Sequence, residues 1–179
     1  MVDARGVHSF VYKKAPGRTA RHHAPNYLIV QGFASAGFPV NKEPTGLFRT
    51  DGKRPDGLVP WQSGKALCWD VTVTCPLADS YVAGAAREAG SAAELAAARK
   101  EDKYSSIDGL YLFEPIAIET LGVYSTSARQ FLSDLGRKIS QCSGEIREVS
   151  FLFQRCSVLV QRFNAVLLHN SLPASDCMD

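Results

Sequence analysis

The sequence predicts a single α+β domain in which a small mixed sheet is flanked by helices. The chain has 179 residues, a length that suits one domain with a substantial core. It is 45% hydrophobic and 21% charged, which is typical of a globular protein and excludes a wholly disordered, collagen-like or coiled-coil chain. Segments of helical and strand character follow in the order α-β-β-β-α-β-α-α, which suits a small sheet with a crossover helix.

The ends of the chain differ from its middle. Residues 1–21 show no hydrophobic period and predict a basic, loosely ordered arm, residues 22–170 the single domain, and residues 171–179 a tail. The basic residues of the arm are Lys13, Lys14, Arg18 and Arg21. No apolar run approaches the roughly 18 residues of a membrane span, and the first residues lack the apolar core of a signal peptide. We therefore expect an intracellular protein, nuclear or cytoplasmic, with no membrane contact and no secretion.

The first half of the domain has the pattern of one helix and three strands. The helix starts at about Asn26 and ends at Gly37, with Pro39 just beyond it. Three strand-like segments follow, at residues 40–48, 54–61 and 65–73. The hairpin-type signals between them are Asp51-Gly52 and Ser63-Gly64. These signals predict an antiparallel meander, with the apolar third segment at the centre of the sheet.

The second half alternates helix and strand. Residues 79–104 are rich in Ala with interspersed Arg, Glu and Lys, which predicts a helix broken near Gly90-Ser91. The apolar run 109–122 predicts a buried strand, and residues 125–144 predict a helix that a Ser or Thr caps. The final amphipathic segment, 144–170, has too many apolar residues for a solvated helix, so we expect it to pack on the sheet.

Two acids on neighbouring strands are the sharpest chemical feature. Asp56 and Asp70 are fourteen residues apart across one turn, so adjacent strands bring them together. An ionised carboxylate in an apolar strand is costly unless it meets a cation, a donor or a metal, and a hard cation such as Mg²⁺ would satisfy both acids. Glu43 and Glu119 are further candidate ligands. Alternatively, Asp56 serves a Pro-Asp-Gly turn and Asp70 pairs with Lys or Arg.

These residues resemble a known superfamily. Pro55-Asp56, followed on the next strand by Asp70, looks like the motif of the PD-(D/E)XK nucleases, whose shared core is α-β-β-β-α-β, over about residues 26–122. More narrowly, the chain from His22 to Ala165 resembles the carboxy-terminal domain that follows the reverse transcriptase in animal retrotransposon-like open reading frames. The runs that carry this resemblance are RHHAPN, EPTGLFRTDGKRPDG, VPWQSGKALCWDVTV, KYSSI, PIAIETLG and FQRCSVLVQRFNA.

The resemblance implies a restriction-endonuclease-like core with extra C-terminal helices, and a Mg²⁺- or Mn²⁺-dependent endodeoxyribonuclease. Its partners would be DNA and a reverse transcriptase polyprotein. The match gives Asp56 and Asp70 the role of binding the metal that activates a water. The superfamily places a lysine two residues after the second acid, and this position is Thr72 here. Some members relocate the lysine.

Two lysines are candidates for that relocated role. Lys103 is the first candidate and Lys100 the second, because both lie near the end of a helix expected beside the sheet. The alternative is that both are ordinary solvated lysines at a helix C-terminus, where cations are favoured. The superfamily also often has a glutamate on the first helix, where this chain has none, so Glu43 or Gln31 would have to substitute.

Basic and amide side chains suggest contacts to nucleic acid, although the net charge of +2 is too small to show such a partner by itself. The candidates in the meander loops are Arg49, Lys53, Arg54 and Lys65. Gln154 and Gln161 lie seven residues apart, hence on one helix face, each beside an arginine. The alternatives are solvated loop charges and polar residues at the edge of a packed helix.

Other polar and aromatic residues favour structural roles. His22 and His23 invite a general-base or metal-ligand interpretation, but a hydrogen bond at the helix start or a surface contact is the simpler one. Trp61 and Trp69 are most simply packing groups of the strands. The five cysteines are odd in number, include no CxxC pair, and fit reduced thiols.

Two hypotheses for function follow from the sequence. In the first, the chain is a nuclease with the metal held by Asp56 and Asp70, assisted by Glu43. In the second, the same fold has lost its chemistry and binds nucleic acid or docks onto the polymerase. Thr72 favours the second hypothesis, whereas the presence of both acids beside basic loops favours the first.

Overall fold

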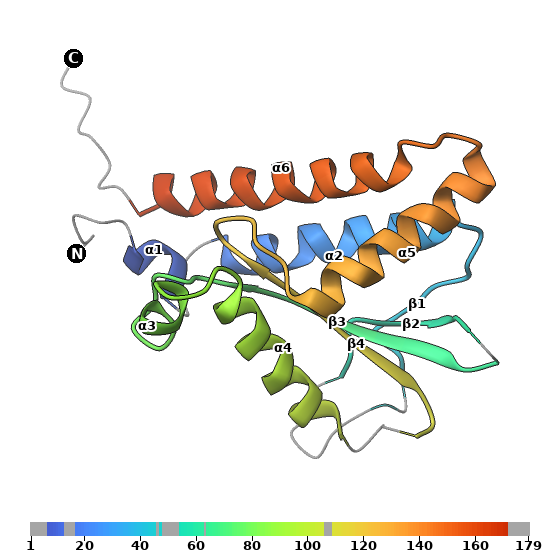
Figure 1. The fold of residues 1–179 in the computed structure, drawn as a ribbon, viewed down its shortest axis with the longest axis horizontal. Helices are drawn as coiled ribbons and strands as arrows, with labels where there is room; N and C mark the ends of the chain where they lie inside the picture. Colours follow the sequence, from blue (N-terminus) through green and yellow to red (C-terminus); the bar gives the residue numbers. More distant parts are fainter. Residues whose placement is uncertain are drawn as a thin grey trace.

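A four-stranded mixed sheet with helices on both faces forms the centre of the structure (Figure 1). The strands are β1 (Asn41–Lys42), β2 (Gly57–Pro60), β3 (Ala66–Thr74) and β4 (Leu112–Glu119), and they lie in the order β1-β2-β3-β4. β1 to β3 form an antiparallel meander, and β4 pairs in parallel with β3. The expected α+β class is thereby confirmed.

The structure is a computed structural model that describes residues 7–12, 17–45, 47, 54–62, 64–105 and 109–171. Its helices are α1 (Val7–Val11), α2 (Arg18–Ser35), α3 (Val82–Ala85), α4 (Ser91–Tyr104), α5 (Thr126–Ser143) and α6 (Glu148–His169). Among the described residues, no helix is both long enough and apolar enough to cross a membrane.

β3 is the central strand, as its apolar sequence predicts, and its residues alternate between the two helical layers. Leu67, Trp69 and Val71 are buried in the core cluster on the side of α2 and α5. Asp70 instead contacts α4, so successive side chains point to opposite faces. β1 is much shorter than the expected strand at 40–48, and the Asp51-Gly52 signal lies outside the described residues.

Helical structure begins earlier in the chain than the sequence suggests. α2 begins at Arg18 rather than near Asn26, and α1 forms within the expected arm of residues 1–21. Arg21 is 3% exposed and donates a hydrogen bond to the carbonyl of Phe10, which fastens α1 to α2. The helix start is hard to predict because this segment carries few apolar residues and contains Pro25. Tertiary contacts stabilise the helix instead.

α4 covers the opposite face of the sheet (Figure 1). The expected long helix at 79–104 is interrupted at Gly90, whose φ of 91° is left-handed, so that α3 and α4 are separate. The small side chains of Ala93, Ala96 and Ala97 pack on Ala117 of β4. This close approach brings the C-terminal turn of α4 against the middle of β3 and β4.

α5 starts and ends where the sequence predicts. The hydroxyl of Ser125 accepts a hydrogen bond from the amide of Ala128, and Gly144 ends the helix with a φ of 76°. α6 packs on α2 and α5, and not on the sheet as expected, because those two helices already cover that face (Figure 1). At Gly136 of α5 a Cβ atom would lie 2.7 Å from the Cα of Val149 in α6, which shows how closely these two helices approach each other.

The cysteines that the structure describes are free thiols, in agreement with the expected reduced state. They are Cys68, Cys75, Cys142 and Cys156, while Cys177 lies outside the described residues. Burial raises the pKa of the Cys68 thiol to about 11, so this sulfur stays protonated at neutral pH.

Gly57 is required by the tryptophan beside it. Gly57 pairs with Trp69 in the ladder between β2 and β3, and a Cβ atom at this position would lie 2.2 Å from atoms of the indole ring. Because Trp69 is fully buried, we expect Gly57→Ala to lower the free energy of unfolding by about 3 kcal/mol. Urea denaturation followed by tryptophan fluorescence measures this change.

A glycine at an open position provides the control for that experiment. A Cβ at Gly37 would meet nothing within 4 Å, and only its left-handed φ of 78° opposes substitution. We expect Gly37→Ala to cost about 1 kcal/mol. Equal stability of Gly57→Ala and the unaltered protein would contradict the packing described for Trp69.

Glu114 of β4 makes the stability of the fold depend on pH. Burial raises the pKa of Glu114 from 4.5 to about 7, with smaller contributions from the charges of Glu101 and Asp134 and an opposing hydrogen bond from Ser127. Its Oε1 is buried without a hydrogen-bond partner among the described residues. Because the unfolded carboxyl ionises near pH 4.5 and the folded one near 7, the free energy of unfolding falls as the pH rises through this interval.

Removing the charge of Glu114 tests this dependence. Over that interval, we expect Glu114→Gln to gain on the order of 3 kcal/mol in stability relative to the unaltered protein. Urea denaturation at several pH values between 4.5 and 8 measures the difference, and Glu88→Gln, at an exposed acid between α3 and α4, is the surface control. Parallel pH profiles for Glu114→Gln and the unaltered protein would show that the carboxyl is not perturbed.

Candidate functional site

Asp56 comes directly before β2, at the point where β3 continues past the start of β2. β2 pairs with β3 as far as Trp69, and the amide of Asp56 donates to the carbonyl of Trp69 at 2.9 Å. Beyond it, the carboxylate Oδ2 of Asp56 accepts a hydrogen bond of 2.7 Å from the amide of Val71. The side chain thus takes the place of the next strand residue. Asp56 therefore extends the ladder and does not serve a Pro-Asp-Gly turn.

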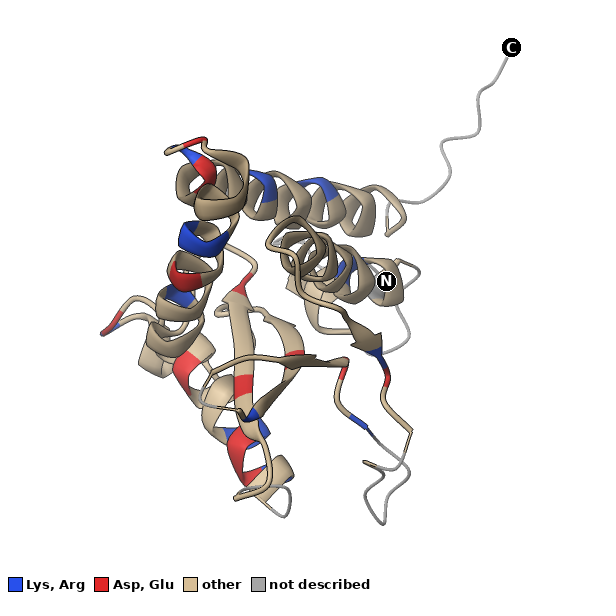
Figure 2. Ribbon diagram, turned by 90° about the vertical axis from the view of Figure 1, so that its right-hand side faces the viewer, with Lys and Arg blue, Asp and Glu red and all other residues tan. Residues whose placement is uncertain are grey.

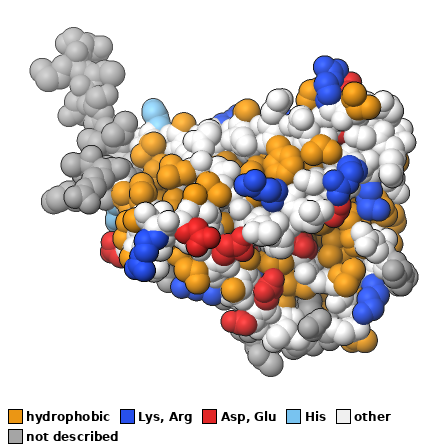
Figure 3. Space-filling model, viewed as in Figure 1, with side chains coloured by type: hydrophobic (Ala, Val, Ile, Leu, Met, Phe, Trp, Pro, Cys, Tyr) orange, Lys and Arg blue, Asp and Glu red, His pale blue; other side chains and the backbone are white. Residues whose placement is uncertain are grey.

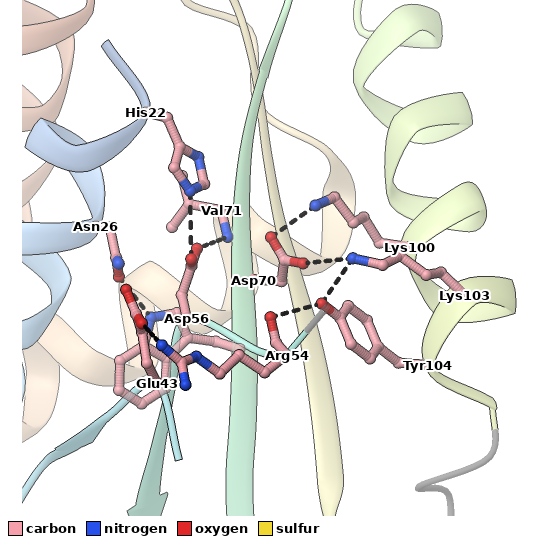
Figure 4. A network of polar contacts seen from close by, with 11 residues as sticks. His22, Asn26, Glu43, Arg54, Asp56, Asp70, Val71, Lys100, Lys103 and Tyr104 are labelled. Carbon is pink, nitrogen blue, oxygen red and sulfur yellow. Dashed lines mark hydrogen bonds and ion pairs between the residues drawn. The ribbon is translucent and has the colours of Figure 1, made fainter. Parts of the chain in front are cut away.

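α2 contributes a histidine to the same carboxylate. Nε2 of His22 donates to Oδ1 of Asp56 at 3.2 Å, as Figure 4 shows. One turn along α2, Oδ1 of Asn26 accepts a hydrogen bond of 2.9 Å from Nε1 of Trp69. The two side chains share a helix face, and together they fix α2 to both acid-bearing strands. His22 thus makes the expected kind of hydrogen bond, but from the second turn of α2 and not from its start, and its i, i+4 spacing with Asn26 is the signal that could have placed it.

Asp70 points to the other helical layer and meets two lysines. Asp70 is 4% exposed, and its Oδ1 lies 2.6 Å from Nζ of Lys100. Its Oδ2 lies 3.5 Å from Nζ of Lys103, one turn further along α4 (Figure 4). A buried carboxylate needs such partners, since desolvation of an unpaired charge is very costly. Both candidate lysines thus reach the acid, and neither is a freely solvated side chain.

Tyr104 connects the lysines to the segment that carries Asp56. Its side chain is 1% exposed, and its hydroxyl donates to the carbonyl of Arg54 at 2.9 Å. The same oxygen accepts a hydrogen bond of 2.7 Å from Nζ of Lys103, which also lies 4.2 Å from the ring centroid. Tyr104 therefore links Lys103 to the segment that precedes β2. The sequence around Tyr104 did not predict this role.

Glu43 lies close to Asp56 through its backbone. Its amide donates to the carbonyl of Asp56 at 3.0 Å, and its exposed carboxylate forms an ion pair with Arg54 (Figure 4). Glu119 caps α4 instead, because its Oε1 accepts hydrogen bonds from the amides of Ala92 and Ala93. The expected role of Glu119 as a further ligand is therefore wrong.

Within the described part of the chain, no group of three or more His, Cys, Asp and Glu side chains is arranged to hold a metal ion. The donor set that remains consists of the two carboxylates of Asp56 and Asp70. Proteins commonly hold Mg²⁺ through one or two carboxylates while waters and substrate phosphates complete the shell. Here the carboxylate of Asp56 is turned to α2 and that of Asp70 to α4. A shallow hollow of about 160 Å³ adjoins Asp56 and is also lined by His23 and Glu43.

Several residues expected to contact nucleic acid lie elsewhere. Lys65 is at the turn between β2 and β3, so the four residues of β2, about 13 Å, separate it from Asp56. Gln154 and Gln161 belong to α6, which packs on α2 and α5 (Figure 1). Gln161 donates to the carbonyl of Thr120 at 3.1 Å. Arg49 and Lys53 lie outside the described residues, so only Arg54 of this group is placed near Asp56.

The described charges do not gather into one basic face. Both basic and acidic positions occur along α4 and α5, as Figure 2 shows. On the face seen in Figure 3, the described charged side chains are scattered among hydrophobic ones. Near the aspartates, Arg54, Lys100 and Lys103 each contact an acid. Any attraction for an anion at this place therefore depends on a rearrangement of these pairs or on an added cation.

No protein-family model matches the chain, and no curated protein matches it either. The chemistry of the site therefore has to be inferred from its own residues. These residues are two aspartates on adjacent strands, two lysines from α4 and a histidine from α2.

The pKa of His22 depends on the carboxylate of Asp56 beside it. The hydrogen bond to Asp56 raises the pKa of His22 above 6.5, burial opposes this, and the charges of Asp56 and Asp70 add to the rise while Lys100 lowers it. The contact stabilises the fold fully below pH 6.5, and its contribution is lost as the pH rises through the raised pKa of His22. We expect NMR titration in the presence of EDTA to show this raised pKa. The pKa should fall in Asp56→Asn and stay raised in the distant control Asp134→Asn.

Proposed function

We propose that the chain is a metal-dependent nuclease-like domain that acts on DNA phosphodiesters and belongs to a retroelement, where it accompanies the reverse transcriptase. The observation that carries the proposal is the buried carboxylate of Asp70 beside Lys100 and Lys103, with Asp56 hydrogen-bonded to the next residue of the same strand, Val71. The order α2-β1-β2-β3-α4-β4 supports it further, because the PD-(D/E)XK resemblance implies this order of elements.

Each residue of the site has a part in this proposal. Asp56 and Asp70 would hold the cation, which when bound lowers the pKa of a water and neutralises charge on the phosphate. Lys103 faces the same acid and stabilises negative charge that develops on the phosphate oxygens. Tyr104 positions Lys103, and His22 orients the carboxylate of Asp56. Lys103 thus supplies the positive charge that Thr72 lacks.

A second candidate function is supported by a different observation. Both aspartates are already engaged, Asp56 by His22 and Val71 and Asp70 by the two lysines. A fold that keeps these pairs permanently would have no carboxylate left for a cation. It would serve as a nucleic-acid-binding or polymerase-docking module, which is the alternative that the sequence also suggested.

Cleavage of DNA separates the two functions. With Mg²⁺ or Mn²⁺ we expect nicking of supercoiled plasmid or cleavage of single-stranded DNA, and a loss of at least about 100-fold in Asp70→Asn and in Lys103→Met. The matched control is Asp134→Asn, because Asp134 is a surface acid of α5 paired with Arg137. Circular dichroism establishes that each variant is folded.

The opposite result would favour the binding module. If the unaltered protein cleaves no DNA with either metal, yet binds a labelled oligonucleotide with an affinity that falls as salt rises, the nuclease proposal is wrong. Fluorescence anisotropy measures that binding. Equal cleavage by Asp70→Asn and the unaltered protein would also reject the proposed site.

A further inference from the structure

The two lysines at Asp70 are held in different ways. Nζ of Lys100 makes the shorter contact, 2.6 Å to Oδ1 of Asp70. Lys103 lies at 3.5 Å from the other oxygen, and its ammonium is also fixed by the hydroxyl and ring of Tyr104. Both side chains are only 22% exposed. Lys100 is thus the direct counter-ion of the carboxylate, whereas Lys103 is anchored at its side.

We propose that Lys100 is a latch that closes Asp70 against divalent cations and has to swing away before the metal binds. This inference rests on the proposed function, because it assumes that Asp70 is a metal ligand. It assigns the two lysines separate roles, with Lys103 acting toward the phosphate and Lys100 controlling entry of the cation.

The ammonium of Lys100 and a bound cation would compete at Oδ1 of Asp70. A Mg²⁺ ion binds carboxylate oxygens at roughly 2.0 to 2.1 Å, so a cation on Oδ1 would occupy the space beside the ammonium that now lies 2.6 Å from that atom. Two positive charges so close in a site shielded from water repel strongly. This repulsion favours a cation on Asp70 only after Lys100 has left Oδ1.

The latch lowers the apparent affinity for the metal. Only molecules with Lys100 displaced can bind the cation, so the apparent dissociation constant rises by the inverse of the displaced fraction. The flexible side chain of Lys100 can leave without unfolding α4, whose Ala93, Ala96 and Ala97 hold the helix on the sheet. The latch is thus a local device on a fixed helix.

Metal binding, and not cleavage, tests the latch. Mn²⁺ is titrated into the protein while free Mn²⁺ is measured by electron paramagnetic resonance. We expect Lys100→Met to bind Mn²⁺ about 10-fold more tightly than the unaltered protein, and Lys100→Gln to show a smaller gain in the same direction. Lys103→Met should gain less than Lys100→Met, since Tyr104 holds that ammonium beside the oxygen and not on it.

Two further variants complete the experiment. Arg99→Met removes one charge from the same helix, but Arg99 contacts Tyr81 and not Asp70, so its Mn²⁺ affinity should stay close to that of the unaltered protein. Asp70→Asn should bind Mn²⁺ far more weakly. Circular dichroism shows which variants are folded, and Lys100→Gln, which keeps a polar group at this position, serves if Lys100→Met does not fold.

The outcomes separate this inference from the proposed function. If the unaltered protein binds Mn²⁺ through Asp70 and neither Lys100 variant binds it more tightly, the latch is wrong while the metal site stands. An equal gain in Arg99→Met would also overturn the latch, because general charge would then explain the effect. If Asp70→Asn and the unaltered protein bind Mn²⁺ equally or not at all, the metal site and the latch are both wrong.

Discussion

A buried negative charge on the central strand is the constraint on which the rest of the structure depends. Asp70 is nearly inaccessible to solvent, and a carboxylate in that position is tolerated only if cations reach it. α4 supplies two of them one turn apart, and it can approach closely because its inner face consists of alanines. The small side chains of α4 and the lysines at its end therefore act together to neutralise the buried carboxylate of Asp70.

The second constraint is the amide of Val71 in β3, which lies beyond the residues that β2 pairs with. An unpaired amide of a buried strand is costly, and the carboxylate of Asp56 satisfies that of Val71. This contact directs the carboxylate toward α2, where His22 meets it. Backbone pairing and the placement of the acid are thus linked, because a β2 that began earlier in the chain would leave no room for the contact between Asp56 and Val71.

Local signals in the sequence predicted the elements that depend on local chemistry. The meander, the central position of β3, the break at Gly90 and the cap at Ser125 all follow from turn, cap and apolar patterns. The start of α2 and the packing of α6 depend on tertiary contacts, which have no short-range pattern. The same holds within the site. The position of Asp56 beside the strand that carries Asp70 follows from strand order, whereas His22, Tyr104 and the nearer position of Lys100 depend on how two helical layers dock.

The charge balance of the site relates its two proposed functions. Asp56 and Asp70 carry two negative charges, and Lys100 and Lys103 carry two positive ones, so the net charge of these four side chains is zero. A neutral His22 leaves this net charge unchanged. A neutral cluster has little attraction for a phosphodiester, whose binding depends mainly on positive charge. A divalent cation would change the sum to plus two and attract the phosphate at the same place. In a nuclease the paired lysines thus delay binding of DNA until the cation arrives, whereas in a binding module DNA itself has to draw the lysines from Asp70. The strength of the contact between Lys100 and Asp70 therefore decides which of the two functions this fold can perform.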